Sequence, residues 1–187
     1  MGKDCPFLSF RFGGWIEVVL ETDRLYLRQL SQGDFMDLAE ILKDPEVMYA
    51  YEHDFTDEDV QIWLDRQLNR YQKDGFGLWA LVEKGSDRMV GEAGLTIQDC
   101  EGQEVLEIGY QLKKRFWHRG YAREAAAGCR DYAFGPLDAP WVCAIIKADN
   151  RASIRVAEAI GMTKEKEFIT RYFAGDMLHY LFGIHRS

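Results

Sequence analysis

The sequence lacks the residue patterns that mark a disulfide framework or a metal site. Its four cysteines lie far apart with no C-x-x-C pair, and its four histidines are equally scattered. Ligands of a structural zinc ion come at short, regular spacings, and these residues show none. We therefore expect free thiols and no bound metal.

Basic residues are also fewer than acidic residues. The chain carries 23 Lys and Arg against 31 Asp and Glu, a formal net charge of -8. A nucleic-acid-binding domain needs a basic face to displace counterions from phosphates. The charge balance predicts no nucleic-acid partner, and basic small molecules or peptides fit it better.

A long apolar run is missing from the first twenty residues. Charged residues and glycines interrupt this stretch before a signal-peptide core or a membrane span can form; they are Lys3, Asp4, Arg11, Gly13, Gly14 and Glu17. We expect a cytoplasmic protein with no membrane partner. No internal repeat, linker or low-complexity segment interrupts the rest of the chain.

What is present is the composition of a folded domain. In 187 residues, 47% are hydrophobic, 13% aromatic and 29% charged. A chain of this length can bury roughly two thirds of its unfolded surface in one core. We expect residues 1–19 to form an N-terminal extension and residues 20–187 to form a single domain.

Hydrophobic periodicity predicts a mixed α/β fold, with an α+β mixed sheet and the element order βααβββαβαββ. Alternating apolar residues indicate strands over 24–30, 78–83, 89–97, 105–112 and 141–146. Apolar residues at helical spacing indicate helices over 35–44, 56–75, 120–133 and 151–160, and a final hairpin turns at 174–176.

The segment 105–133 carries the strongest chemical signal. It runs from a strand through a basic turn into a helix rich in small residues. The start of a helix presents unsatisfied N–H groups and a positive dipole end, which suits a phosphate. Arg115, Arg119 and Arg123 add positive charge, and Gly120 would let a ligand approach the backbone. An ordinary basic surface turn is the alternative.

The residues Trp117-His118-Arg119-Gly120-Tyr121-Ala122 resemble the pyrophosphate loop of GNAT acetyltransferases, written Q/R-x-x-G-x-G/A. The flanking E-I-G-Y and A-x-E-A pieces resemble the branch that includes the bacterial ribosomal-protein acetyltransferases RimJ and RimL. Segments 21–28, 148–153 and 159–162 resemble further parts of that branch, so the resemblance spans Glu21 to about Ile184. Trp117 departs from the pattern, since Gln or Arg is usual there.

This resemblance implies the GNAT acyl-CoA N-acyltransferase fold, with splayed central strands and acetyl-CoA as cosubstrate. The implied contacts to the cofactor are Tyr110, Gln111, Leu112, Arg115, Trp117, His118, Arg119, Gly120, Tyr121, Ala122, Arg123, Asn150 and Ser153. Three of them also fit simpler structural roles. Tyr110 and Leu112 share one face of a strand and fit a core, and Asn150 fits the N-cap of the next helix.

An alkyl amine with a pKa of ~10.4 must lose a proton before it attacks a thioester. Glu107 is the first candidate for the base and Glu92 the second, although both fit solvent-facing sheet positions. Many GNAT enzymes place a proton-donating Tyr where this chain has Ala157, so Ser153 is the expected donor, unless it only satisfies amides in its helix's first turn. Tyr49, Tyr51 and Glu92 are the expected acceptor contacts.

The resulting hypothesis is an N-acetyltransferase that moves acetyl from acetyl-CoA to a primary amine by direct attack in a ternary complex. The amine belongs to a protein N-terminus or a small molecule. A non-catalytic acyl-CoA-binding regulatory module is the main alternative, and a phosphate-binding protein unrelated to CoA is another. Whether the protein forms a homodimer stays open.

Overall fold

The computed structural model describes residues 7–11, 14–172 and 175–186. Its strands are β1 (Phe7–Arg11), β2 (Gly14–Glu21), β3 (Leu25–Arg28), β4 (Leu78–Glu83), β5 (Arg88–Cys100), β6 (Gln103–Leu112), β7 (Trp141–Lys147), β8 (Thr163–Tyr172) and β9 (Gly175–His185). Its α-helices are α1 (Phe35–Leu42), α2 (Asp57–Lys73), α3 (Tyr121–Phe134) and α4 (Arg151–Ala159). Short 3-10 turns form η1 (Gln32–Asp34), η2 (Tyr49–Tyr51) and η3 (Lys114–Phe116).

The described strands form one mixed sheet in the order β1-β2-β3-β4-β5-β6-β7-β9-β8. All neighbours are antiparallel except β6 and β7, which run parallel. Strands β5 and β6 pair along ten positions, whereas β6 and β7 pair only at Glu107 and Cys143. The two strands therefore diverge beyond Glu107, which agrees with the expected splay.

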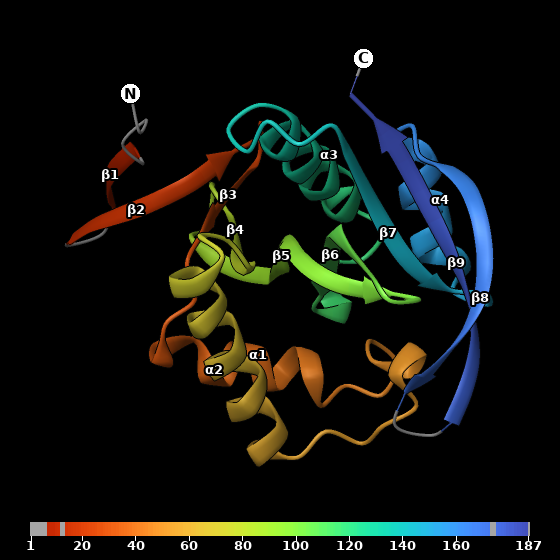
Figure 1. Cartoon of the computed structure of the whole chain (residues 1–187). Coiled ribbons are helices and arrows are strands. Elements are labelled where there is room, and N and C mark those ends of the chain that lie inside the picture. Colours follow the sequence, from red (N-terminus) through yellow and green to blue (C-terminus); the bar gives the residue numbers. More distant parts are fainter. Residues whose placement is uncertain (1–6, 12–13, 173–174, 187) are drawn as a thin grey trace.

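Helices cover the sheet on both sides (Figure 1). Helices α1 and α2 pack on one face, and α3 and α4 lie on the other. Because side chains alternate along a strand, Glu107 and Gln111 of β6 face the α2 side, while Ile108 and Tyr110 face the α3 side. The sheet thus separates two helix layers, and the gap between β6 and β7 connects the two faces.

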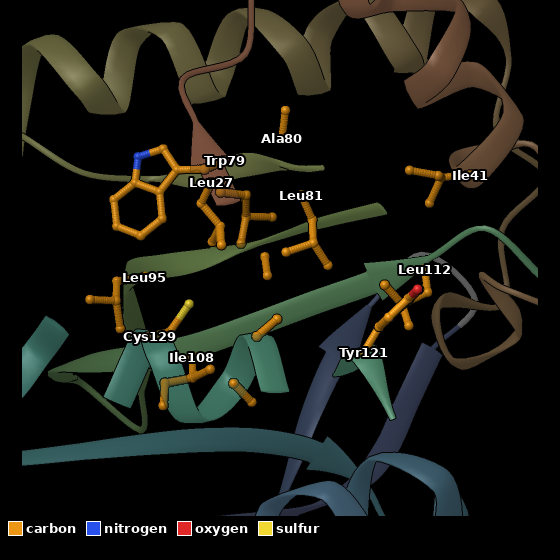
Figure 2. Packing of buried hydrophobic residues seen from close by; sticks show 14 of the residues in the cluster. Leu27, Ile41, Trp79, Ala80, Leu81, Leu95, Ile108, Leu112, Tyr121 and Cys129 are labelled. Atoms are coloured by element: carbon orange, nitrogen blue, oxygen red, sulfur yellow. The ribbon is translucent and has the colours of Figure 1, made fainter. Parts of the chain in front are cut away.

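The core on the α3 side depends on small helix residues. Ala125, Ala126 and Cys129 of α3 are fully buried, which lets the helix approach the sheet closely. Figure 2 shows Leu95 and Ile108 pointing from the sheet toward Cys129. Burial of apolar side chains such as Leu95 and Ile108 is worth roughly 1.5–3 kcal/mol each, so this layer holds α3 against the sheet.

The expected element order is confirmed, with two strands added before it. Strands β1 and β2 extend the sheet beyond the expected first strand, and β2 also contacts α3. Part of the final turn, Ala174, lies outside the described residues, but Tyr172 and Gly175 pair across it. No helix in the described ranges combines the length and the apolar composition needed to cross a lipid bilayer.

Candidate active site

A cavity of about 560 Å³ opens where β6 and β7 diverge. Residues 107–112 of β6 and 144–147 of β7 form its walls. One end reaches the start of α3 at Gly120, and α4 borders it at Ser153. The other end reaches α2 and the η2 segment. The cavity therefore connects a helix start to the α2 side of the sheet.

The start of α3 has the geometry expected of an anion site. Gly120 is the N-cap and adopts a φ of +80°, which other residues rarely tolerate. The Glu124 amide donates to the Gly120 carbonyl (3.1 Å), so the regular helical ladder begins there. The amides before Glu124 belong to the first turn, whose N–H groups lack carbonyl partners within an α-helix. Together with the helix dipole, they favour a bound phosphate.

Arg24, the residue before β3, holds this loop, a role that sequence reasoning missed. Its guanidinium donates to the Glu124 carboxylate (Nε to Oε2, 2.7 Å) and to the Arg119 carbonyl (3.0 Å). It also lies 4.7 Å from the centre of the Tyr121 ring. The Tyr121 hydroxyl donates in turn to Glu83 at the end of β4. The helix start is thus fixed by residues distant in sequence.

The basic residues of the loop divide into two groups. His118 and Arg123 line the cavity, as do Gly120, Tyr121 and Ala122. Arg115 instead pairs with Glu40 of α1 and lies over the Phe116 ring. The Arg119 guanidinium also lies over that ring (5.2 Å). The structure therefore does not bring Arg115 and Arg119 to the cavity wall with the others.

Trp117 lines the cavity but is tied to the protein backbone. Its indole N–H donates to the Leu112 carbonyl at the end of β6 (2.9 Å). An indole has only this one donor, so the side chain has none left for a phosphate. Trp117 thus fastens the loop to the strand where the motif usually has Gln or Arg.

Tyr110, Asn150 and Ser153 meet between β6 and α4. The Tyr110 hydroxyl donates to the Ser153 carbonyl (3.1 Å), and burial raises the pKa of Tyr110 above its usual value. Asn150 Oδ1 accepts from the Ser153 amide (3.0 Å), so Asn150 is the N-cap of α4. All three also line the cavity. The cap role of Asn150 is confirmed, and it leaves the amide nitrogen of that side chain unused by the cap.

Glu107 lies where β6 leaves β7. Its Oε1 accepts from the Ile145 amide of β7 (3.2 Å), and its Oε2 accepts from the Thr96 hydroxyl (3.4 Å). Burial raises the pKa of Glu107 to about 7, although these hydrogen bonds and the charge of Arg70 act in the opposite direction. A carboxyl with this pKa can exchange a proton near neutral pH, as a general base must.

Comparison with known proteins identifies this arrangement. A family model described as an acetyltransferase (GNAT) domain matches residues 24–163. The chain belongs to the GNAT acetyltransferase family. YkkB of Bacillus subtilis is 37% identical over 148 residues, which cover 79% of this chain and 86% of YkkB.

Solved structures agree with this assignment. The GNAT-family acetyltransferase from Bacillus anthracis superposes with a TM-score of 0.76 at 25% identity, covering 89% of this chain and 97% of that one. RimL, the ribosomal L7/L12 acetyltransferase in complex with coenzyme A, gives 0.73 at 14% identity, covering 90% and 98%. At that identity the likeness to RimL is one of fold alone. The expected GNAT fold and acetyltransferase activity are confirmed, and GNAT acetyltransferases use acetyl-CoA and an acceptor.

The η2 segment of this GNAT domain borders the cavity on the α2 side. Tyr49 is 42% exposed, and Tyr51 packs edge-on against Trp63 (5.9 Å between ring centres). The Tyr51 hydroxyl accepts from Gln111 Nε2 (3.3 Å). Tyr49, Tyr51 and Trp63 all line the cavity. The structure thus brings both tyrosines to the cavity wall, and their contact with an acceptor stays a prediction.

Acidic residues of this segment are already paired. Glu46 binds Lys114, just after β6, and Glu52 binds Lys147, at the end of β7 (2.5 Å each). These pairs fasten the segment to both sides of the splay. The acidic loop is therefore a weak source of attraction for a cationic acceptor, contrary to the simplest reading of its charge.

Glu92 is separated from the cavity. It is fully buried, and the Trp63 indole donates to its Oε2 (3.2 Å). Its Oε1 has no hydrogen-bond partner among the described residues. Burial raises the pKa of Glu92 to about 8. The structure thus groups Glu92 with the core under α2, whereas Glu107 lines the cavity wall.

Replacing Glu92 by glutamine should stabilise the protein increasingly as the pH rises. In the unfolded chain this carboxyl has its ordinary pKa of 4.5, so folding becomes less favourable between about pH 4.5 and pH 8 as the proton is lost. The variant lacks this penalty. We expect its advantage in unfolding free energy to grow by roughly 3 kcal/mol at most from about pH 6 to pH 9, measured by urea denaturation. A constant difference would show that Glu92 is charged throughout.

No cluster of three or more His, Cys, Asp or Glu side chains suited to a metal ion lies in the part of the chain that the structure describes.

Six polar residues that the sequence analysis did not name also line the cavity: Arg66, Gln67, Arg70, Thr96, Gln98 and His179. Sequence reasoning missed them because helix and strand periodicity alone does not show which polar residues face a gap between strands. For the residues on α2, the available signal was the spacing of Arg66 and Arg70, which lie one turn apart on the same helix face.

Proposed function

We propose that this GNAT enzyme transfers an acetyl group directly to a primary amine, with Glu107 as the general base. The observation that carries the proposal is the position of Glu107 in the β6–β7 splay, with a pKa of about 7 and a place on the cavity wall. An amine with a pKa of ~10.4 arrives mostly protonated, and Glu107 would take that proton. Direct attack gains mainly from orientation of the two reactants in one cavity.

The cofactor contacts follow from the same cavity. Acetyl-CoA supplies the activated acetyl group when bound. We propose that the amides of residues 118–123 hold its diphosphate, with Arg123 adding charge. The edge of β6 at Tyr110, Gln111 and Leu112 would lie along its pantetheine arm. Asn150, whose Oδ1 caps α4, lies close enough to the cavity for its amide nitrogen to take part.

Ser153 is the proposed proton donor to the departing thiolate. Its amide is held by Asn150 and its carbonyl by Tyr110, so its position in the first turn of α4 is fixed from two sides. Tyr110 also lines the cavity there, and its raised pKa keeps it in the neutral phenol form whose O–H holds the Ser153 carbonyl. A protein N-terminus and a small amine are both compatible with this chemistry. Cytoplasmic location stays a prediction, and a homodimer stays open.

The test is release of CoA thiol from acetyl-CoA in the presence of a panel of amines, with mass spectrometry of the products. Thiol release coupled to N-acetylation supports the enzyme. Saturable CoA binding without thiol release for any amine would favour the regulatory module. Binding of simple nucleotides as tight as that of CoA would favour the phosphate-binding alternative.

A further inference from the structure

Two arginines occupy the acceptor end of the cavity. Arg66 and Arg70 lie one turn apart on α2, and both line the cavity together with Glu107. Both also border an adjacent open groove between α2 and β5, where Gln98 is shared as well. They therefore stand where that groove opens into the cavity.

Neither arginine forms an ion pair within the described ranges. Arg70 donates to Gln67 Oε1 (3.3 Å), which is a neutral acceptor. Burial and the neighbouring charge of Arg66 both lower the pKa of Arg70, and the charges of Glu107 and Asp74 offset this only in part. Two adjacent guanidinium groups in this setting repel each other, and an anion between them would relieve the repulsion.

Hydrogen-bond acceptors lie on the β6 side of the same cavity. Glu107 is one, and the buried Oε1 of Gln111 has no hydrogen-bond partner among the described residues. Both side chains leave the same face of β6, four residues apart. Four residues of a strand span about 13 Å, so a single amine cannot contact both side chains, and it is the Glu107 carboxyl that interacts with the charge of Arg70. The acceptor end is thus positive on α2 and rich in acceptor atoms on β6.

The groove outside this end carries acidic residues, Asp65, Asp74, Asp99 and Glu104. None of them lies within ion-pair distance of Arg66 or Arg70 in the described structure. Asp65 accepts instead from Gln32 and Gln61. Because these acids do not pair with Arg66 or Arg70, both guanidinium groups are available to a ligand.

We propose that the acceptor amine carries an oxyanion, a carboxylate or a phosphate, which Arg66 and Arg70 bind while the amine faces Glu107. This inference rests on the proposed acetyl transfer and names its substrate class. A guanidinium matches carboxylate and phosphate oxygens with paired N–H donors. Polyamines and other purely cationic amines would meet repulsion at the same place. The small acceptor is therefore zwitterionic, although the overall net charge of -8 by itself points to cations.

Matched acceptors test this directly. Linear amino acids of increasing length would be compared with their carboxamides and with aminoalkyl phosphates of the same length, by thiol release. We expect kcat/KM to be about 10- to 100-fold higher for one of the anionic series than for the carboxamides, as charge-assisted hydrogen bonds imply. The series that is preferred identifies the oxyanion. Equal or higher kcat/KM for the carboxamides would overturn the inference while leaving acetyl transfer intact.

Variants locate the effect. Arg66→Gln and Arg70→Gln should each raise KM for the anionic acceptor about tenfold or more and leave KM for acetyl-CoA unchanged. Arg70→Lys should recover part of the loss, and exposed Arg171→Gln on β8 is the control. Because Arg66 is exposed, its substitution should not disturb folding. Equal loss for acids and carboxamides in both variants would contradict the assignment.

A binding measurement separates this inference from catalysis. Calorimetric titration with CoA present would compare an N-acetyl amino acid with its carboxamide. Tighter binding of the acid, lost in Arg70→Gln, supports the oxyanion site even if no amine in the panel is acetylated. Equal binding of these two and of an N-acetyl aminoalkyl phosphate rejects it in either case.

Discussion

Replacing Glu107 by glutamine is expected to lower kcat/KM at neutral pH by about 100-fold or more, because general-base catalysis contributes on that order. Glutamine keeps the size of the side chain and can still accept from the Ile145 amide through its oxygen. It cannot take a proton from the amine. Steady-state thiol release at saturating acetyl-CoA and varied acceptor concentration measures the loss in kcat/KM, and a calorimetric titration with CoA confirms that binding is retained.

The pH dependence distinguishes a base from a structural residue. In the native enzyme kcat/KM should rise with pH until Glu107 has lost its proton, with an inflection near its pKa of about 7. The variant should lack this inflection, and its loss should shrink at high pH, where more of the free amine is already neutral. Exposed Glu158→Gln on α4 is the control. A constant ratio of variant to native activity across pH would assign the base elsewhere.

Replacing Gly120 by tryptophan should reduce the affinity for CoA by about 100-fold or more. Gly120 lines the cavity at the helix start, so a large side chain would occupy the space proposed for the diphosphate and block its approach to the first-turn amides. The substitution also forces a bulky residue into a φ of +80°. Isothermal calorimetry with CoA gives the affinity directly.

The matched control is Gly102→Trp in the turn between β5 and β6. Gly102 adopts a φ of +82° and has open space around its α-carbon, so it imposes similar backbone strain outside the cavity. Thermal denaturation of the two variants should therefore show comparable destabilisation. Native CoA affinity in Gly120→Trp would remove the basis for the proposed diphosphate site.

The sequence predicted the expected order of elements because local signals marked each one. Strand β4 was predicted with its observed bounds, since five of its residues are buried in succession between two turns. The start of α3 was also predicted, because glycine followed by small apolar residues is typical of a helix that packs closely on a sheet. The divergence of β6 and β7 was predicted from the family resemblance alone, because no hydrophobic periodicity distinguishes diverging parallel strands from paired ones.

Contacts between distant residues were beyond prediction. Nothing near Arg24 indicates that it reaches Glu124, and nothing near Glu46 or Glu52 indicates that lysines after β6 and at the end of β7 neutralise them. Arg66 and Arg70 are the opposite case. In the sequence they look like an ordinary solvated helix face, whereas in the structure they line the cavity. Side-chain pairing across a fold depends on the tertiary arrangement, which short-range patterns do not encode.

The Arg24 and Glu124 pair joins residues one hundred positions apart. The glycine motif around Gly120 is therefore not a self-sufficient module that could be grafted with its own helix. The segment before β3 supplies part of what holds this loop, through the bonds of Arg24 to Glu124 and to the Arg119 carbonyl. The proposed diphosphate site should therefore depend on a contact between residues far apart in sequence, which is of the kind that forms slowly in folding.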